Sequence, residues 1–207
     1  QPPEIAARAY LLVDVTAAQV LAEKNADEKV EPASLTKLMT AYLVFDALRQ
    51  KKITLTQTFS VSPKAWKMEG SRMFIDPKMQ VPVEDLLKGM IVQSGNDATM
   101  ALAEGVGGTS EHFVEMMNAR ARELGCVRTH FVNSHGLHDE QHYSTARDLA
   151  IIARAAMREL FRILRPGGCG IVMVPLIVGV EDTQEDPAVN TPELRWKYHA
   201  QDDHLRL

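Results

Sequence analysis

Apolar positions follow two different periods along this chain. Residues 9–15 and 19–22 are short aliphatic runs separated by Thr16-Ala17-Ala18, a pattern that predicts two antiparallel strands joined by a tight turn. Residues 34–48 instead carry apolar side chains at too many positions for a single helical stripe, which predicts a helix buried on most sides. The chain therefore combines strands and helices from its beginning.

Helical spacing returns after residues 53–80, a stretch typical of loops and short strands. Three helices are predicted, over residues 83–93, 97–106 and 111–124. Gly107-Gly108 and Gly125 end the second and third, because glycine readily takes the left-handed conformation that closes a helix. We interpret residues 82–125 as a helical subdomain. A fourth helix is expected to begin at Thr145-Ala146-Arg147-Asp148, which has the form of a capping box.

The sequence changes character after about residue 157. Residues 164–168, Leu-Arg-Pro-Gly-Gly, predict a sharp turn, and residues 171–174 predict a strand. An acidic segment punctuated by prolines follows from residue 181 to the end. We therefore divide the chain into residues 1–157 and residues 158–207.

Composition narrows the class of protein without identifying it. The 207 residues are 45% hydrophobic and 24% charged, as in ordinary globular proteins. The net charge of -4 and the lack of a dense Lys/Arg cluster argue against nucleic acid or an anionic membrane as a partner. Cys126 and Cys169 form no disulfide framework or metal pair. The chain opens with Gln1-Pro2-Pro3-Glu4 in place of a signal peptide, so we expect either a cytoplasmic protein or a mature exported chain.

The Ser-Leu-Thr-Lys sequence of residues 34–37 is an S-x-x-K motif at the start of a predicted helix. The spacing places Ser34 and Lys37 on one face, close enough to share a proton. A serine hydroxyl is a weak nucleophile unless a base takes its proton, and a lysine does so only if its pKa is lowered. Apolar neighbours predict that Lys37 is buried, and the helix N-terminus would favour an oxyanion. The alternative is a capping serine and a solvated lysine.

Ser94, Gly95 and Asn96 form an S-x-N sequence in the break between two predicted helices. Side chains in such a break can project into a cleft from a rigid support. The alternative is again a helix cap. The order of the two motifs, roughly sixty residues apart, makes the pair far more specific than either, because S-x-x-K with S-D-N and K-T-G marks serine β-lactamases and penicillin-binding proteins.

Residues 5–157 resemble the D-alanyl-D-alanine carboxypeptidases, the low-molecular-mass penicillin-binding proteins of peptidase family S11. The matching stretches are residues 9–14, 31–40, 70–74, 92–98 and 142–148. The resemblance implies an α/β fold of the serine β-lactamase and penicillin-binding-protein type, with Ser94 on a helical subdomain. The sheet is expected to be incomplete, because in the family its remaining strands come from a region that is missing here.

The resemblance also implies a site and its chemistry. Ser34 would attack the D-Ala-D-Ala bond of peptidoglycan stem peptides, and Lys37 would take its proton. Ser94 would relay a proton to the leaving amine, and Asn96 would bind the acyl-side amide of the substrate. β-Lactams would acylate the same serine. The family is periplasmic and is usually held at the inner membrane by a C-terminal helix, which is not seen here; no cofactor or metal is implied.

The third family motif is missing. No Lys-Thr-Gly or Lys-Ser-Gly occurs in the sequence, although in the family this motif binds the substrate carboxylate and lies beside the second oxyanion donor. One lost oxyanion donor costs about 10²–10³ in rate. The alternatives to an active enzyme are therefore an inactive module that binds peptidoglycan or β-lactams, and a chimeric fragment.

The tail from residue 158 resembles a fragment of a class I S-adenosylmethionine methyltransferase over residues 160–168. Any α/β protein can form such a helix, turn and strand. We interpret the chain as a carboxypeptidase front joined near residues 157–161 to this fragment. Methyl transfer is not expected, because the only glycine-rich candidate for a cofactor loop, residues 105–108, ends a helix.

His135, His138, His142 and Asp139 have the residue types and spacing of a metal site, since imidazoles and carboxylates at short spacing are common zinc ligands. The sequence around His135 matches the carboxypeptidase pattern, in which this stretch is a structural loop without metal. We therefore predict no metal at these residues.

Overall fold

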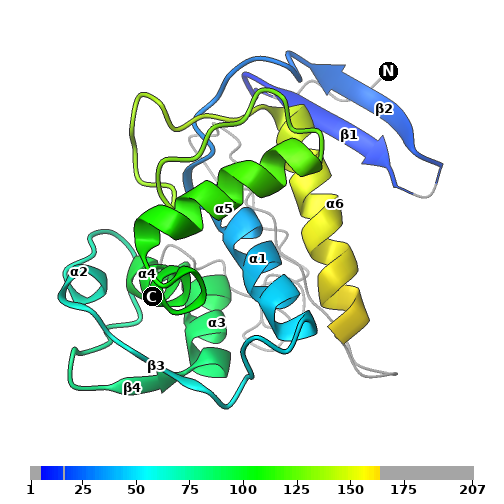
Figure 1. Cartoon of the computed structure of the whole chain (residues 1–207). Coiled ribbons are helices and arrows are strands. Elements are labelled where there is room, and N and C mark those ends of the chain that lie inside the picture. The colour runs from blue at the N-terminus through cyan, green and yellow to red at the C-terminus, as the bar shows by residue number, and fades with distance from the viewer. Residues whose placement is uncertain (1–5, 16, 164–207) are drawn as a thin grey trace, which may run out of the picture. The chain divides into compact units, whose positions relative to one another are not determined.

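The computed structural model describes residues 6–15 and 17–163 (Figure 1). The chain folds into two compact units. The first contains the N-terminal hairpin, and the second begins at Asn25. The turn predicted at residues 164–168 and the strand predicted at residues 171–174 lie outside the described residues.

The N-terminal unit contains the predicted antiparallel hairpin, β1 (Tyr10–Asp14) and β2 (Gln19–Lys24). Its register shifts between Leu12 and Val13. Asp14 Oδ1 accepts a hydrogen bond from Ala17 N–H at 2.9 Å, the local contact by which a short acidic side chain stabilises a turn. In the part of the chain that the structure describes, no third strand joins this hairpin, so the sheet there is incomplete as expected.

Helix α1 (Lys37–Arg49) is the central helix of the larger unit. Figure 1 shows it between α6 (Ala146–Ile163) and the pair α3 (Val83–Val92) and α4 (Asn96–Gly107), and it packs against all three. Its Val44 and Phe45 enter a hydrophobic cluster with α3 and α4, whereas its Met39 and Leu43 enter a second cluster with α5 (Ser110–Glu123) and α6. Two cores on one helix explain why its apolar positions exceed a single stripe.

The three helices predicted between residues 83 and 124 are present as α3, α4 and α5. Gly108 and Gly125 follow α4 and α5 with φ of 79° and 84°, which confirms that these glycines end the helices. Before them, β3 (Thr58–Ser60) pairs antiparallel with β4 (Gln80–Pro82). In the sequence, the short α2 (Pro63–Trp66) follows β3 and precedes β4. The apolar pattern does not predict it. The helical subdomain over residues 82–125 stays a prediction.

Helix α6 begins at the predicted capping box, where Thr145 Oγ1 accepts a hydrogen bond from Asp148 N–H at 3.0 Å. It then continues without a break past residue 157. Glu159 Oε2 lies 3.7 Å from Arg49 Nε of α1, and Leu160 packs against the core. The helix therefore does not end where the sequence changes character.

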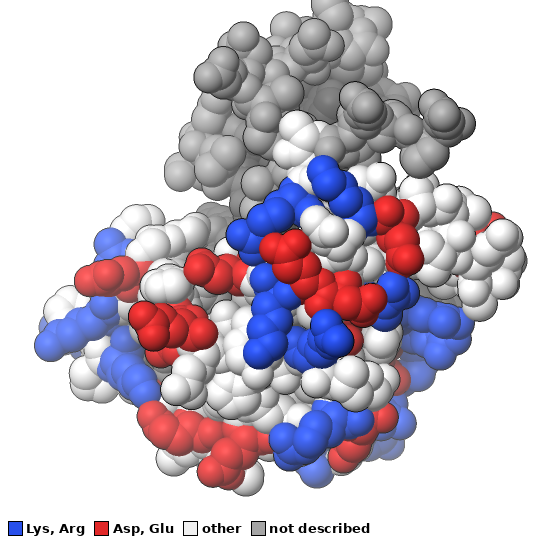
Figure 2. Space-filling model, turned by 90° about the horizontal axis from the view of Figure 1, so that it is seen from above, with Lys and Arg blue, Asp and Glu red and all other residues white. Residues whose placement is uncertain are grey.

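Within residues 6–15 and 17–163, no helix is both long and apolar enough to cross a membrane. Figure 2 shows one face, on which Lys and Arg side chains lie among Asp and Glu side chains. Charges of both signs on one face largely cancel at a distance.

Candidate active site

The serine of the S-x-x-K motif lies in a short 3-10 turn. This turn, Ala33–Thr36, leads directly into α1, has Pro32 at its N-cap and is capped by no side chain. Ala33 has φ of 45°, a left-handed conformation that costs a residue with a Cβ about 1–2 kcal/mol. The Ser34 side chain is exposed. Ser34 is therefore not a helix cap, and its hydroxyl is open to a substrate.

Lys37 is buried beside this serine, as predicted, with 7% of its surface exposed. Its Nζ lies 3.3 Å from Ser34 Oγ and donates a hydrogen bond to His135 O at 2.9 Å. Burial lowers the pKa of Lys37 to about 8, because an ammonium loses its hydration in the interior. At pH 7 roughly one molecule in ten then carries the neutral amine, the form that can accept a proton from serine.

Ser94 adds a second hydroxyl to the pair. Its Oγ lies 3.2 Å from Ser34 Oγ, and its φ of 54° is left-handed like that of Ala33. The N-cap of α4 is Gly95, and no side chain caps that helix, so neither Ser94 nor Asn96 acts as a cap. Strained residues of this kind occur where the surrounding structure enforces a particular side-chain position.

Asn96 is held by the loop that precedes β4. Its Nδ2 donates to Glu69 O at 2.7 Å, and the side chain is buried. Gly70 has φ of 80°, and a Cβ there would lie 2.8 Å from Asn96 Nδ2. The adjacent Asp97, 1% exposed, accepts hydrogen bonds from the backbone N–H groups of residues 73 and 75 at 3.0 and 3.2 Å. The start of α4 and this loop therefore form one wall of the site.

A second support of the site is the loop of residues 133–137, which the S-x-x-K and S-x-N motifs do not include. Two backbone carbonyls of this loop receive side chains of α1: His135 O accepts from Lys37 Nζ, and Ser134 O accepts from Thr40 Oγ1 at 2.7 Å. Main-chain carbonyls leave no mark in a side-chain motif, which is why the motifs alone do not reveal this loop.

The same loop approaches the nucleophile turn more closely than a side chain would allow. Gly136 has φ of 90°, and a Cβ at this position would lie 1.8 Å from Ala33 O. Asn133 Oδ1 accepts from Gly136 N–H at 2.7 Å and closes the loop. The Asn-x-x-Gly spacing is a turn signal, and it is the one sequence feature that could have identified this contact.

The four residues considered for a metal site do not converge. His138 is exposed and lies 3.2 Å from Glu31 Oε2, whereas His142 is buried with its Nε2 2.8 Å from Thr36 Oγ1. Burial, and next the charge of Lys37, lower the pKa of His135 to about 4. Among the described residues no group of three or more His, Cys, Asp or Glu side chains is placed to hold a metal ion.

Ser34, Lys37 and Ser94 thus form a compact group with complementary properties. An exposed hydroxyl lies beside a buried amine of lowered pKa, and a second hydroxyl lies within hydrogen-bond distance of the first. This arrangement can activate a serine for attack on a carbonyl and can pass a proton onward.

Comparison with known proteins gives one consistent result. The family model of peptidase S11, D-alanyl-D-alanine carboxypeptidase, matches residues 1–165. D-alanyl-D-alanine carboxypeptidase DacC of Escherichia coli K12 is 46% identical over 166 residues, which are 77% of this chain and 42% of that protein. The crystal structure of penicillin binding protein 5 from Haemophilus influenzae matches with a TM-score of 0.75 at 45% identity, over 77% of this chain and 47% of that one. The predicted fold class is confirmed, and the chain spans about two fifths of the length of DacC.

The matched region extends past the residue at which the sequence changes character. The family match runs to residue 165, so the join placed near residues 157–161 falls inside it. D-alanyl-D-alanine carboxypeptidase DacB2 of Mycobacterium tuberculosis H37Rv is 31% identical over 198 residues, 95% of this chain and 64% of that protein. The methyltransferase resemblance of residues 158–207 finds no support in these comparisons.

Proposed function

Because the chain belongs to the D-alanyl-D-alanine carboxypeptidase family, peptidase S11, we propose that it is a serine-type carboxypeptidase that removes the terminal D-alanine of peptidoglycan stem peptides. The observation that carries this proposal is the position of a buried amine, Lys37 Nζ, 3.3 Å from the exposed hydroxyl of Ser34. A solvated lysine would stay protonated at neutral pH and could not act as a base.

The proposed reaction has two steps. Ser34 Oγ attacks the carbonyl carbon of the D-Ala-D-Ala bond while its proton passes to neutral Lys37. Ser94 relays a proton to the leaving nitrogen, so that D-alanine departs and an ester to Ser34 remains. Water then attacks the ester carbonyl, the bond between the acyl carbon and Ser34 Oγ breaks, the shortened peptide leaves as a carboxylic acid, and the serine regains its proton. The 3.2 Å separation of the two hydroxyl oxygens supports the relay, and Asn96, buried beside it, is proposed to bind the acyl-side amide.

The motif that binds the substrate carboxylate in the family has no counterpart in this sequence. Lys-Thr-Gly does not occur in the sequence, and Leu35 N–H already bonds to Pro32 O at 3.0 Å, so it is not a donor for an oxyanion. The oxyanion donor that lies beside this motif in the family is therefore assigned to no residue here. The proposal concerns the nucleophile, the base and the proton relay.

The same site suggests the partners. A β-lactam presents a strained amide that Ser34 can open in the first step, so we propose that penicillins acylate this chain at Ser34. Stem peptides lie outside the inner membrane, so a periplasmic location follows from the proposed substrate. No cofactor is required for either step, because the serine and the lysine supply the nucleophile and the base.

Release of D-alanine from a peptide that ends in D-Ala-D-Ala tests the proposal. The full chain is compared with Ser34→Ala and with Ser60→Ala, a control at an exposed serine of β3. Release by the wild type and by the control, with none by Ser34→Ala, supports the proposed reaction. If the wild type binds the peptide but none of the three proteins releases D-alanine, the chain is instead an inactive binding module.

A further inference from the structure

A buried histidine contacts the motif that carries the nucleophile, from a part of the chain outside the site motifs. His142 Nε2 lies 2.8 Å from Thr36 Oγ1, and Thr36 is the last residue of the nucleophile turn, directly before the base Lys37. Thr36 is 0% and His142 3% exposed, so water does not compete for this hydrogen bond.

The direction of this hydrogen bond follows from the other ring nitrogen. Val132 N–H donates to His142 Nδ1 at 3.1 Å, so Nδ1 is the unprotonated nitrogen. In a neutral imidazole the proton then resides on Nε2, which donates it to Thr36 Oγ1. Both ring nitrogens are used, and this assignment leaves no buried polar atom of His142 without a partner. Burial lowers the pKa of His142 to about 4, which keeps the ring in this neutral form.

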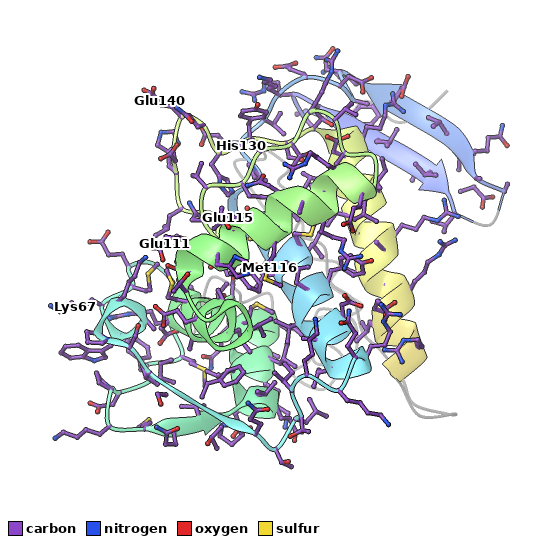
Figure 3. All side chains as sticks on the ribbon, in the orientation of Figure 1. Lys67, Glu111, Glu115, Met116, His130 and Glu140 are labelled. Carbon is purple, nitrogen blue, oxygen red and sulfur yellow. The ribbon has the colours of Figure 1, made fainter. Side chains whose placement is uncertain are left out.

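The histidine itself is fixed by its own segment. His142 N–H donates to Asp139 O at 2.9 Å. The two residues that follow it form isolated antiparallel β-bridges, Tyr143 with His130 and Ser144 with Val30. Figure 3 marks this segment by His130 near α5 and by Glu140 at the outer end of its loop. A ring held this firmly can position the group to which it donates.

We propose that His142 is a positioning residue of the acylation step: its Nε2–H, donated to Thr36 Oγ1, holds the strained turn that keeps Ser34 beside Lys37. This inference rests on the proposed function for its kinetic consequence, but its structural part does not. The turn needs such a support because Ala33 lies in a left-handed conformation and no side chain caps the turn. Without the bond, the turn can relax and Ser34 moves relative to Lys37.

The test compares two buried threonines of the same helix region. Thr36→Val removes the hydroxyl that His142 binds, whereas Thr40→Val removes the hydroxyl that binds Ser134 O one turn further on. Both residues are 0% exposed, so both changes lose a buried hydrogen bond of similar kind. We expect Thr36→Val to acylate with a fluorescent penicillin roughly 10- to 100-fold more slowly than the wild type, the loss caused by a small misplacement of reacting groups. Thr40→Val loosens the loop at Ser134 O, next to the carbonyl that binds Lys37, so it should also slow acylation, but several-fold less than Thr36→Val does.

Two further variants separate positioning from stability. Thr36→Ser keeps the hydroxyl and should restore most of the rate. His142→Gln combined with Thr36→Val should be no slower than Thr36→Val alone, since one interaction is removed once. Thermal unfolding of each variant confirms that the compared proteins are folded. Equal slowing in Thr36→Val and Thr40→Val would overturn the inference and leave the bond a structural contact.

A second measurement works even if no acylation occurs. The pKa of Lys37, followed by NMR of carbon-13-labelled lysine, should rise toward its ordinary value in Thr36→Val, because a loosened turn admits water to Nζ. It should rise less in Thr40→Val than in Thr36→Val. If the wild type is not acylated, the proposed function fails, and the Lys37 pKa in the two variants still decides the inference. An unchanged pKa in Thr36→Val overturns it.

Discussion

Replacing the buried base should change how stability depends on pH. The pKa of Lys37 falls from 10.5 in an exposed lysine to about 8 in the folded chain. Between these values the unfolded state holds a proton that the folded state has lost, so stability rises with pH across this window and is lower below it. At about 1.4 kcal/mol per pH unit, the full effect is about 3 kcal/mol, of which about 2 kcal/mol is gained between pH 7 and about pH 9.5.

Lys37→Met removes this titration and keeps an unbranched apolar side chain of similar length. Unfolding by urea is measured for both proteins at several pH values between pH 7 and about pH 9.5. The free energy of unfolding of the wild type minus that of Lys37→Met should rise by about 2 kcal/mol, because every other titrating group is shared. The orphaned His135 carbonyl lowers the stability of Lys37→Met by about 1–3 kcal/mol at every pH and so does not alter the slope. A difference that stays flat would refute the burial and the lowered pKa on which the proposed base depends.

Three further predictions concern the supports of the site. Gly136→Ala places a Cβ 1.8 Å from Ala33 O and should lower the free energy of unfolding by at least about 2 kcal/mol and abolish penicillin labelling; labelling at the wild-type rate would contradict the close approach of the two loops. Asp97→Asn should cost about 1–3 kcal/mol, seen in urea unfolding and as faster proteolysis within residues 69–75, since the carboxylate accepts two of that loop's N–H groups. The pKa of His142 is lowered from 6.5 to about 4, so the wild type should lose up to about 3 kcal/mol as pH falls through that window; an acid-unfolding profile of His142→Gln as steep as that of the wild type would disprove this.

Helices and the hairpin could be predicted because their signals are local. Alternating aliphatic residues, helical apolar spacing and glycine stops placed β1, β2 and α3 to α5, with α1 recognised as buried on several sides. The short α2 could not be predicted in the same way, since a single turn that begins with Pro63 has no apolar period and depends on the Ser62 cap. The family match past residue 157 was missed because the sequence of α6 changes composition before the helix ends.

The candidate site likewise has features that the sequence predicts and features that only the structure shows. Ser34 with Lys37 and Ser94 with Asn96 are side-chain motifs, and their spacing was enough to identify them. The left-handed backbone of Ala33 and the carbonyl of His135 depend on contacts between segments about a hundred residues apart in sequence. Such contacts are set by packing, and no local pattern encodes them.

The most direct test of the whole account is the intact mass of the full chain after incubation with penicillin, for the wild type and for Ser34→Ala. Opening of the β-lactam ring by Ser34 adds the complete mass of the drug, because no atom leaves. The account predicts a single adduct on the wild type, on a peptide that contains residues 34–37, and no adduct on Ser34→Ala. Folded wild type that gains no mass, or an adduct that persists in Ser34→Ala, would contradict the assignment of Ser34 as the nucleophile.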